Sequence, residues 1–295
     1  MQQLHARWTR NGTLLCVGLD PEFERLPLSI QRAQTAVLAL EGDRMGAQAE
    51  GAIFTFNQAI VDATADLVCA FKPNAAFYEA HGPAGVRALI RTIAYIHGRY
   101  PGIPVILDAK RGDIGSTSQA YARAAFEVCD ADAITLHPYL GEEALLPFLD
   151  RPEKGCFILC RTSNPGSDEF QDLRVQRDDT VKGAAEPLFA QVAQQVARRW
   201  NRHGNCALVV GATYPDELRQ VRSIVDSLPI LVPGVGAQGG DLEATLRAGL
   251  DSHGQGLIVS VSRSVLYASS GPDFAEAARQ EAVKLWQEMN RIRGA

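Results

Sequence analysis

The sequence predicts a single α/β domain over residues 1–295, a (β/α)8 barrel of the TIM type. Eight short runs rich in Val, Ile and Leu recur along the chain, as strands buried on both faces require. Amphipathic helical patterns separate these runs, so strand and helix alternate eight times. That number of repeats is typical of a closed barrel rather than an open sheet.

Each strand is expected at one of the apolar runs. In chain order these are residues 13–20, 65–73, 103–110, 131–138, 155–162, 206–213, 229–236 and 256–263. Helical patterns between them include residues 116–129, 186–200 and 241–250.

Two connections between strands are long. The one after the first strand has room for extra helices, with candidate patterns at residues 32–40 and 54–65. The other, residues 164–180 after the fifth strand, is polar and has no clear periodicity. It predicts an insertion or a mobile loop.

The bulk composition favours a soluble, cytoplasmic protein without nucleic-acid or membrane partners. The 295 residues are 46% hydrophobic and 21% charged, with a formal net charge of −5. No apolar stretch approaches the length of a membrane span, and the N-terminal apolar run ends early at Asp20. The six cysteines include no C-x-x-C pair, which favours buried thiols in a reducing compartment.

Polar side chains follow the predicted strands at the ends where barrel enzymes carry their catalytic groups. They are Asp20, Lys72, Asp108, Lys110, His137, Arg161, Thr162, Ser163 and Arg263. A structural network of ion pairs is the alternative interpretation. So many charges at one end of the strands favour an active site instead.

Asp108 and Lys110 are two residues apart, so an extended strand would place both on one face, with Cα atoms about 6.6 Å apart. Lys72, one strand over, is expected to reach the same patch. Alternating acid and base keeps each group ionised, because an opposite charge offsets desolvation.

A phosphate site is predicted after the last two strands, where barrels often bind phosphate. The loop "PGVGAQGGD" at residues 233–241 carries four glycines whose amides could approach an anion. Gln238 adds a donor and Arg263 a bidentate fork. The alternative is that the glycines only permit a tight turn.

The remaining polar residues give weaker evidence of a catalytic role. His137 is more typical of a hydrogen-bonded structural histidine than of a catalyst, and no cluster has metal-ligand spacing. Thr162 and Ser163 lack an evident base, which favours contacts to a substrate over a nucleophilic role.

The segment "LDAKRGDIGST" at residues 107–117 resembles the D-x-K-x-x-D signature of the orotidine 5'-phosphate decarboxylase family, in its longer bacterial (type 2) subgroup. Further similar motifs are "GLDP" at Gly18, "FKPN" at Phe71, "SNPG" at Ser163 and "PGVGAQGGD" at Pro233. The arginine after the last strand also matches, but Ser262 precedes it where many relatives have glycine.

The resemblance implies a role for each matching residue. Lys110 would protonate C6 of the pyrimidine after carbon dioxide leaves, and Asp108 would lie beside the substrate carboxylate. Lys72 and Asp20 would contact the ribose, and Ser163 the pyrimidine. Phosphate would be bound by Gly236, Ala237, Gln238 and Arg263.

The resemblance also implies a homodimer in which Asp113 and Thr117 enter the active site of the neighbouring subunit. The expected substrate is orotidine 5'-phosphate, converted to uridine 5'-phosphate in pyrimidine biosynthesis, and no metal or organic cofactor is expected.

Three other functions stay open at this point. A sugar-phosphate decarboxylase on the same barrel would use the charge array with a magnesium ion. A Schiff-base aldolase would need a neutral Lys72 or Lys110, whereas lysines flanked by carboxylates stay protonated. A non-catalytic phosphate-binding barrel would leave Asp108 and Lys110 without a purpose.

Overall fold

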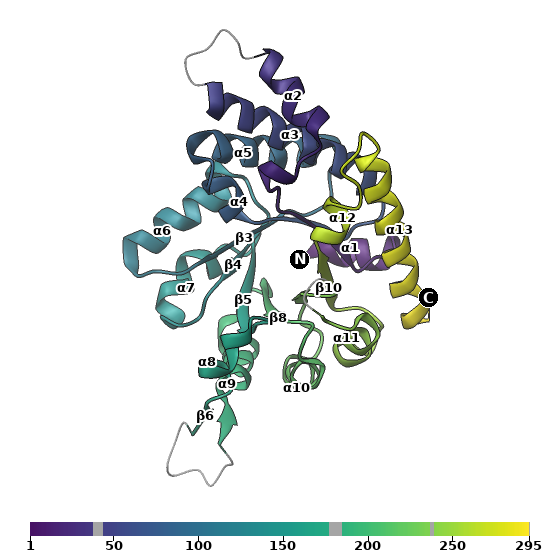
Figure 1. The fold of residues 1–295 in the computed structure, drawn as a ribbon. Helices are drawn as coiled ribbons and strands as arrows, with labels where there is room; N and C mark the ends of the chain where they lie inside the picture. The colour runs from purple at the N-terminus through teal and green to yellow at the C-terminus, as the bar shows by residue number, and fades with distance from the viewer. Residues whose placement is uncertain (38–43, 177–184, 237–238, 295) are drawn as a thin grey trace. The chain divides into compact units, whose positions relative to one another are not determined.

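The protein is described here from a computed structural model, which covers residues 1–37, 44–176, 185–236 and 239–294 (Figure 1). Its main sheet is a (β/α)8 barrel of eight strands in the order β2-β1-β10-β9-β8-β5-β4-β3. The strands are β1 (Leu15–Leu19), β2 (Ala70–Pro73), β3 (Ile106–Arg111), β4 (Ala133–Leu136), β5 (Gly155–Arg161), β8 (Cys206–Val210), β9 (Ile230–Pro233) and β10 (Leu257–Val261).

These strands confirm the predicted runs. All eight overlap the expected ranges, and only β3 continues one residue further, to Arg111. Neighbouring strands pair parallel, for example Cys16 with Ala70 and Cys156 with Cys206, and the register of β5 against β8 shifts between Leu159 and Arg161. Isolated parallel bridges from Phe71 to Val105 and from Asn74 to Asp108 join β2 to β3, the two ends of the strand order. These bridges close the ring.

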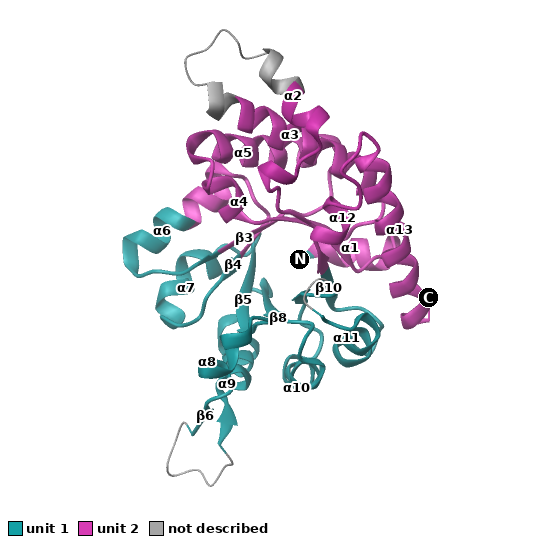
Figure 2. Cartoon of the chain, viewed as in Figure 1, with its two compact units in different colours: residues 1, 110–121, 135–259 teal, residues 2–109, 122–134, 260–295 magenta. Residues whose placement is uncertain are grey.

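Two compact units make up the chain (Figure 2). Unit 1 consists of residues 1, 110–121 and 135–259, and unit 2 of residues 2–109, 122–134 and 260–295.

Unit 2 contains the N- and C-terminal helices of the chain. Its helices are α1 (Gln2–Arg10), α2 (Leu28–Val37), α3 (Arg44–Thr64), α4 (Ala75–Glu79), α5 (Gly82–Arg99), α12 (Arg263–Leu266) and α13 (Phe274–Arg293). Helices α2 and α3 are the extra helices predicted after the first strand; residues 38–40 of the first candidate lie outside the described residues. The apolar face of α3 buries Ile53, Phe56 and Ile60 completely.

Helix α1 was not predicted. It buries Leu4 and Trp8, which lie four residues apart on one helical face. Between them, Arg7 donates from Nε to the carbonyl oxygen of Val68 at 2.8 Å, at the approach to β2. Packing within unit 2 therefore stabilises a helix whose nine residues are too few to be stable alone.

Unit 1 contains helices α7 (Glu142–Leu149), α8 (Asp168–Gln171), α9 (Leu188–Gln195), α10 (Pro215–Val225) and α11 (Leu242–Gly249), and α6 (Gly115–Arg123) begins in it. The predicted insertion forms the short α8 and a two-residue strand, β6 (Arg174–Val175), which pairs antiparallel with β7 (Glu186–Pro187). Residues 177–180 of that insertion lie outside the described residues. Helix α11 begins with the Asp241 side chain accepting from the Ala244 amide at 2.7 Å.

Within the described ranges, no helix combines the length and apolar composition that crossing a membrane requires. All six cysteines are free thiols, and five of them are buried.

Candidate active site

A buried ion pair joins β2 to β3 in unit 2. Lys72 Nζ is 3.0 Å from Asp108 Oδ2, with side-chain exposures of 7% and 12%. Asp108 is the last of the three buried residues that begin β3, and Lys72 is one of the four buried residues of β2. The structure thus brings together two of the predicted catalytic residues.

The carboxylates around Lys72 keep it charged. Burial of the ammonium lowers the pKa of Lys72, but Asp108 and then Asp20 raise it, and the net effect is a pKa above the ordinary value. Asp20 follows β1, and its Oδ1 atom is buried without a hydrogen-bond partner among the described residues. A buried acceptor left open in this way can receive a ligand hydroxyl.

Close packing positions Asp20. A Cβ atom added to Gly18 would lie 2.9 Å from Cβ of Ser262 and 3.1 Å from Oδ2 of Asp20, so β1 needs glycine here. Tyr267 donates its hydroxyl to the Asp20 carbonyl oxygen at 3.2 Å and accepts from the Glu22 amide at 2.7 Å. The loop after β1 is therefore fixed by the residues that follow β10.

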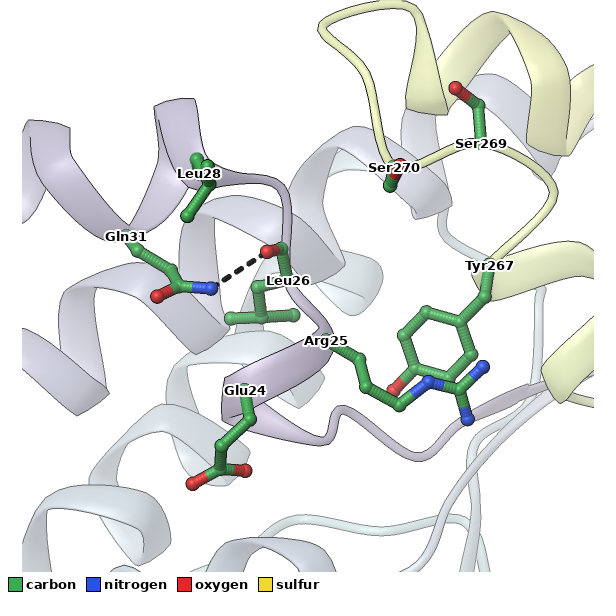
Figure 3. A pocket seen from close by; sticks show the side chains of 8 residues that line it. All are labelled: Glu24, Arg25, Leu26, Leu28, Gln31, Tyr267, Ser269 and Ser270. Atoms are coloured by element: carbon green, nitrogen blue, oxygen red, sulfur yellow. Dashed lines mark hydrogen bonds between the residues drawn. The ribbon is translucent and has the colours of Figure 1, made fainter.

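That loop also borders a hollow of about 410 Å³ (Figure 3). The hollow is lined by Glu24, Arg25, Leu26, Leu28, Gln31, Tyr267, Ser269 and Ser270. The Arg25 guanidinium lies 3.7 Å from the centre of the Tyr267 ring, and Gln31 donates to the Leu26 carbonyl oxygen at 2.8 Å. None of the eight is a predicted site residue.

The predicted phosphate arginine also belongs to unit 2. Arg263 is the first residue of α12 and its side chain is exposed. Ser262, which precedes it, has a buried hydroxyl oxygen without a partner among the described residues. The departure from glycine at this position therefore leaves an unsatisfied polar atom next to Gly18.

Lys110, in unit 1, is exposed and has a left-handed backbone, with φ of 48°. Its amide donates to Thr135 Oγ1 at 2.9 Å. The prediction that Lys110 shares a face with Asp108 assumed an extended strand, and that assumption was wrong at Lys110. A left-handed residue interrupts the alternation of side chains along the strand.

The two residues predicted to act across a subunit interface, Asp113 and Thr117, come shortly after Lys110 in the chain. Asp113 is half-buried, and its Oδ1 accepts from the Ile114 amide at 2.7 Å. Thr117 lies in the first turn of α6 and is exposed. Ile114 between them is 61% exposed, which is high for isoleucine.

Ser163 lies on a loop that Arg161 anchors. Arg161 is fully buried at the end of β5, bonds to Asp172 at 3.1 Å and stacks 3.8 Å from the centre of the Tyr214 ring. A Cβ atom on Gly211 would lie 2.6 Å from Cβ of Ser163, so only glycine permits this approach. Arg161 therefore supports the loop that presents Ser163.

The glycine-rich loop after β9 folds on itself. Gly236 and Gly239 have positive φ values, 69° and 84°, which favour glycine. The Gly236 amide donates to Gly240 at 3.0 Å, and the Gly240 amide donates to Gly234 at 3.2 Å. These two amides are therefore engaged within the loop in this structure, and phosphate binding by the loop stays a prediction. Ala237 and Gln238 lie outside the described residues.

Thr135, on β4, was not among the predicted site residues, and His137, directly after β4, was interpreted as structural. Thr135 accepts from Lys110, and His137 Nε2 donates to the Gly112 carbonyl oxygen at 2.9 Å, which agrees with the structural interpretation of that histidine. The signal that could have found Thr135 is its two-residue spacing from His137 in an otherwise apolar strand.

Fold and side chains together define a TIM-barrel enzyme with acidic and basic residues at the carboxyl ends of its strands. The family model described as orotidine 5'-phosphate decarboxylase / HUMPS family matches residues 13–280. The chain belongs to this family.

Curated relatives match nearly the whole chain. An orotidine 5'-phosphate decarboxylase of Herpetosiphon aurantiacus is 54% identical over 282 residues, covering 96% of this chain and 94% of the relative. One from Cupriavidus taiwanensis is 49% identical over 292 residues, covering 99% and 98%.

Two solved structures are similar to this chain over nearly its whole length. Leishmania donovani OMP decarboxylase is 38% identical with a TM-score of 0.78, covering 100% of this chain and 98% of that chain. Leishmania donovani UMP synthase is 40% identical with a TM-score of 0.81, and the match spans 99% of this chain but 56% of that longer one.

Proposed function

We propose that this chain decarboxylates orotidine 5'-phosphate to uridine 5'-phosphate, a step of pyrimidine biosynthesis, with Lys110 as the proton donor to C6. It is a carboxy-lyase, because relatives with 49% and 54% sequence identity are named orotidine 5'-phosphate decarboxylase. The observation that carries the proposal is the buried Lys72–Asp108 pair at 3.0 Å, on the strand that continues into Lys110.

The reaction breaks the bond between C6 and the carboxylate carbon, and the electron pair stays on C6. An ammonium at Lys110 stabilises this developing carbanion and then protonates it, which leaves a neutral amine that regains its proton from water. The proposed reaction uses no metal and no organic cofactor.

The buried pair supplies fixed charges to that site. Asp108 places a negative charge near the departing carboxylate, and Lys72 offsets the desolvation of Asp108. Because the pair is rigid and shielded from water, its field changes little during the reaction, as electrostatic preorganisation requires.

Other residues hold the remote parts of the substrate. Asp20, with its open buried Oδ1, and Lys72 bind the ribose, and Ser163 binds the pyrimidine. Arg263 and Gln238, with the backbone at Gly236 and Ala237, bind the phosphate.

The active enzyme in this proposal is a cytoplasmic homodimer. Asp113 and Thr117 reach the partner's active site, and the exposed Ile114 packs in the interface. The single catalytic domain expected over residues 1–295 remains part of the proposal.

The test is the loss of pyrimidine absorbance when orotidine 5'-phosphate is added to the purified protein, with and without a chelator. The proposal expects equal rates in both. A rate that the chelator abolishes and magnesium restores would support the sugar-phosphate type of chemistry, and no absorbance change would contradict the proposal.

A further inference from the structure

We propose that Thr135 on β4 and His137, directly after β4, are positioning residues that hold Lys110 in its left-handed conformation and thereby aim its ammonium at the substrate. This inference rests on the proposed function, in which Lys110 is the proton donor.

Lys110 has a backbone conformation that lysine disfavours. At φ of 48°, the Cβ atom crowds the carbonyl group that follows it, and lysine has no short polar group to compensate locally. Such a conformation persists only when the surrounding structure imposes it, and it is concentrated at functional sites. Lys110 must therefore be held by its neighbours.

Thr135 and His137 together hold three consecutive residues of that segment. Thr135 Oγ1 accepts from the Lys110 amide at 2.9 Å. The His137 amide donates to the Arg111 carbonyl oxygen at 3.1 Å, and His137 Nε2 donates to the Gly112 carbonyl oxygen at 2.9 Å. All these contacts lie within unit 1.

Thr135 is well placed to act as a fixed support. Thr135 is 1% exposed, so water does not replace its hydroxyl as the acceptor. Threonine is also stiff at χ1, which fixes the direction of Oγ1. Losing the hydroxyl would leave the Lys110 amide without this partner and would free the backbone to return to an extended conformation.

His137 supports the same segment at Gly112, two residues after Lys110. A Cβ atom on Gly112 would lie 2.8 Å from His137 Nε2, so the ring packs directly on the backbone of Gly112. Because a carbonyl oxygen only accepts, the ring must carry its proton on Nε2. His137 therefore both blocks movement of this segment and bonds to it.

The consequence for the reaction is geometric. A proton donor displaced by about 1 Å from its productive position loses about 100-fold in rate. The phosphate and ribose ligands do not depend on Lys110, so substrate binding should change little. A positioning role therefore predicts a loss in kcat with KM nearly unchanged.

The experiment compares Thr135→Val, which keeps the shape and removes the acceptor, with Thr135→Ser, which keeps the acceptor. Thr245→Val is the matched control, because Thr245 in α11 is buried and its hydroxyl has no partner among the described residues. We expect kcat for orotidine 5'-phosphate to fall about 10- to 100-fold in Thr135→Val, with KM within about threefold. Thr135→Ser and Thr245→Val should stay within about threefold of the wild type.

If Thr135→Val does not fold, a second pair of variants tests the same inference. His137→Gln keeps a donor for the Gly112 carbonyl oxygen, and His137→Ala removes it; only the latter should lower kcat with KM unchanged.

Two results would overturn the inference. Wild-type kcat in folded Thr135→Val or His137→Ala would do so while the proposed function stands, because the wild type is still active. An inactive wild type would overturn the proposed function and this inference together.

Discussion

The ammonium of Lys72 and the carboxylate of Asp108 form an ion pair of 3.0 Å that is almost completely withdrawn from solvent. The pair contributes a fixed charge array to the proposed site, and breaking it is expected to destabilise the protein. Removing one partner of a buried pair leaves an uncompensated charge, which is worse than removing both.

Stability of the single and double variants tests this coupling. Lys72→Met and Asp108→Leu should each lower the free energy of unfolding by about 3 to 5 kcal/mol, because each leaves one buried charge unpaired. The double variant should be destabilised by less than the sum of the two. Denaturant unfolding of all four proteins measures the coupling, and strictly additive losses would show that the two charges do not interact.

Phosphate recognition is tested at Arg263. Arg263→Ala should weaken orotidine 5'-phosphate by about 2 to 5 kcal/mol and leave the phosphate-free nucleoside nearly unaffected. Arg219→Ala, an exposed arginine on α10, controls for the change in net charge. Equal losses for both compounds, measured as kcat/KM, would refute a phosphate role for Arg263.

Sharing of the site between subunits is tested with two inactive variants, Lys110→Ala and Asp113→Ala. If Asp113 acts in the partner's site, each mixed dimer has one site with both residues intact, and statistical exchange restores about a quarter of all sites. If Asp113 acts within its own chain, every site keeps one lesion. A mixture that exchanges subunits, as verified by mass spectrometry, yet stays inactive would argue against the shared site.

The pH dependence of stability is expected to involve His97. Its Nε2 is 2.9 Å from Asp132 and its Nδ1 is 3.3 Å from Asp130. The hydrogen bond to Asp132 raises the pKa of His97, and burial opposes this only in part. The folded pKa thus lies above the unfolded value of about 6.5. The stabilisation is fully present below that value and is lost as pH rises through the folded pKa.

We therefore expect His97→Asn to destabilise the protein more at pH 5.5 than at pH 9, as measured by denaturant midpoints. His203→Asn, which changes an exposed histidine, is the control. A loss that is equal at both pH values would show that the His97 contacts do not depend on its charge.

The strands were predictable because continuous apolar runs leave few alternatives to a buried parallel strand. The proximity of Lys72 and Asp108 was predictable because both lie toward the carboxyl ends of neighbouring barrel strands. Helix α1 was missed because only two of its residues, Leu4 and Trp8, are buried, and this signal is weak in a short polar segment.

The backbone at Lys110 could not be predicted from sequence. No local preference of lysine leads to a positive φ; the conformation depends on Thr135, which is 25 residues away in the chain. The role of Arg161 was also not evident, because a strand-end arginine can face a ligand or, as here, turn inward to Asp172 and Tyr214. Both features depend on tertiary contacts.

The most direct test of the account is turnover of orotidine 5'-phosphate by Lys110→Ala, followed as carbon dioxide release and uridine 5'-phosphate formation. The variant should fold, because Lys110 is exposed. It should also keep its affinity for the phosphate group of the product, because Lys110 does not contact that group in the proposed site. Its turnover should fall by many orders of magnitude, because the carbanion at C6 has lost its stabilising cation and its proton source. Near-wild-type turnover in purified, folded Lys110→Ala would contradict the account.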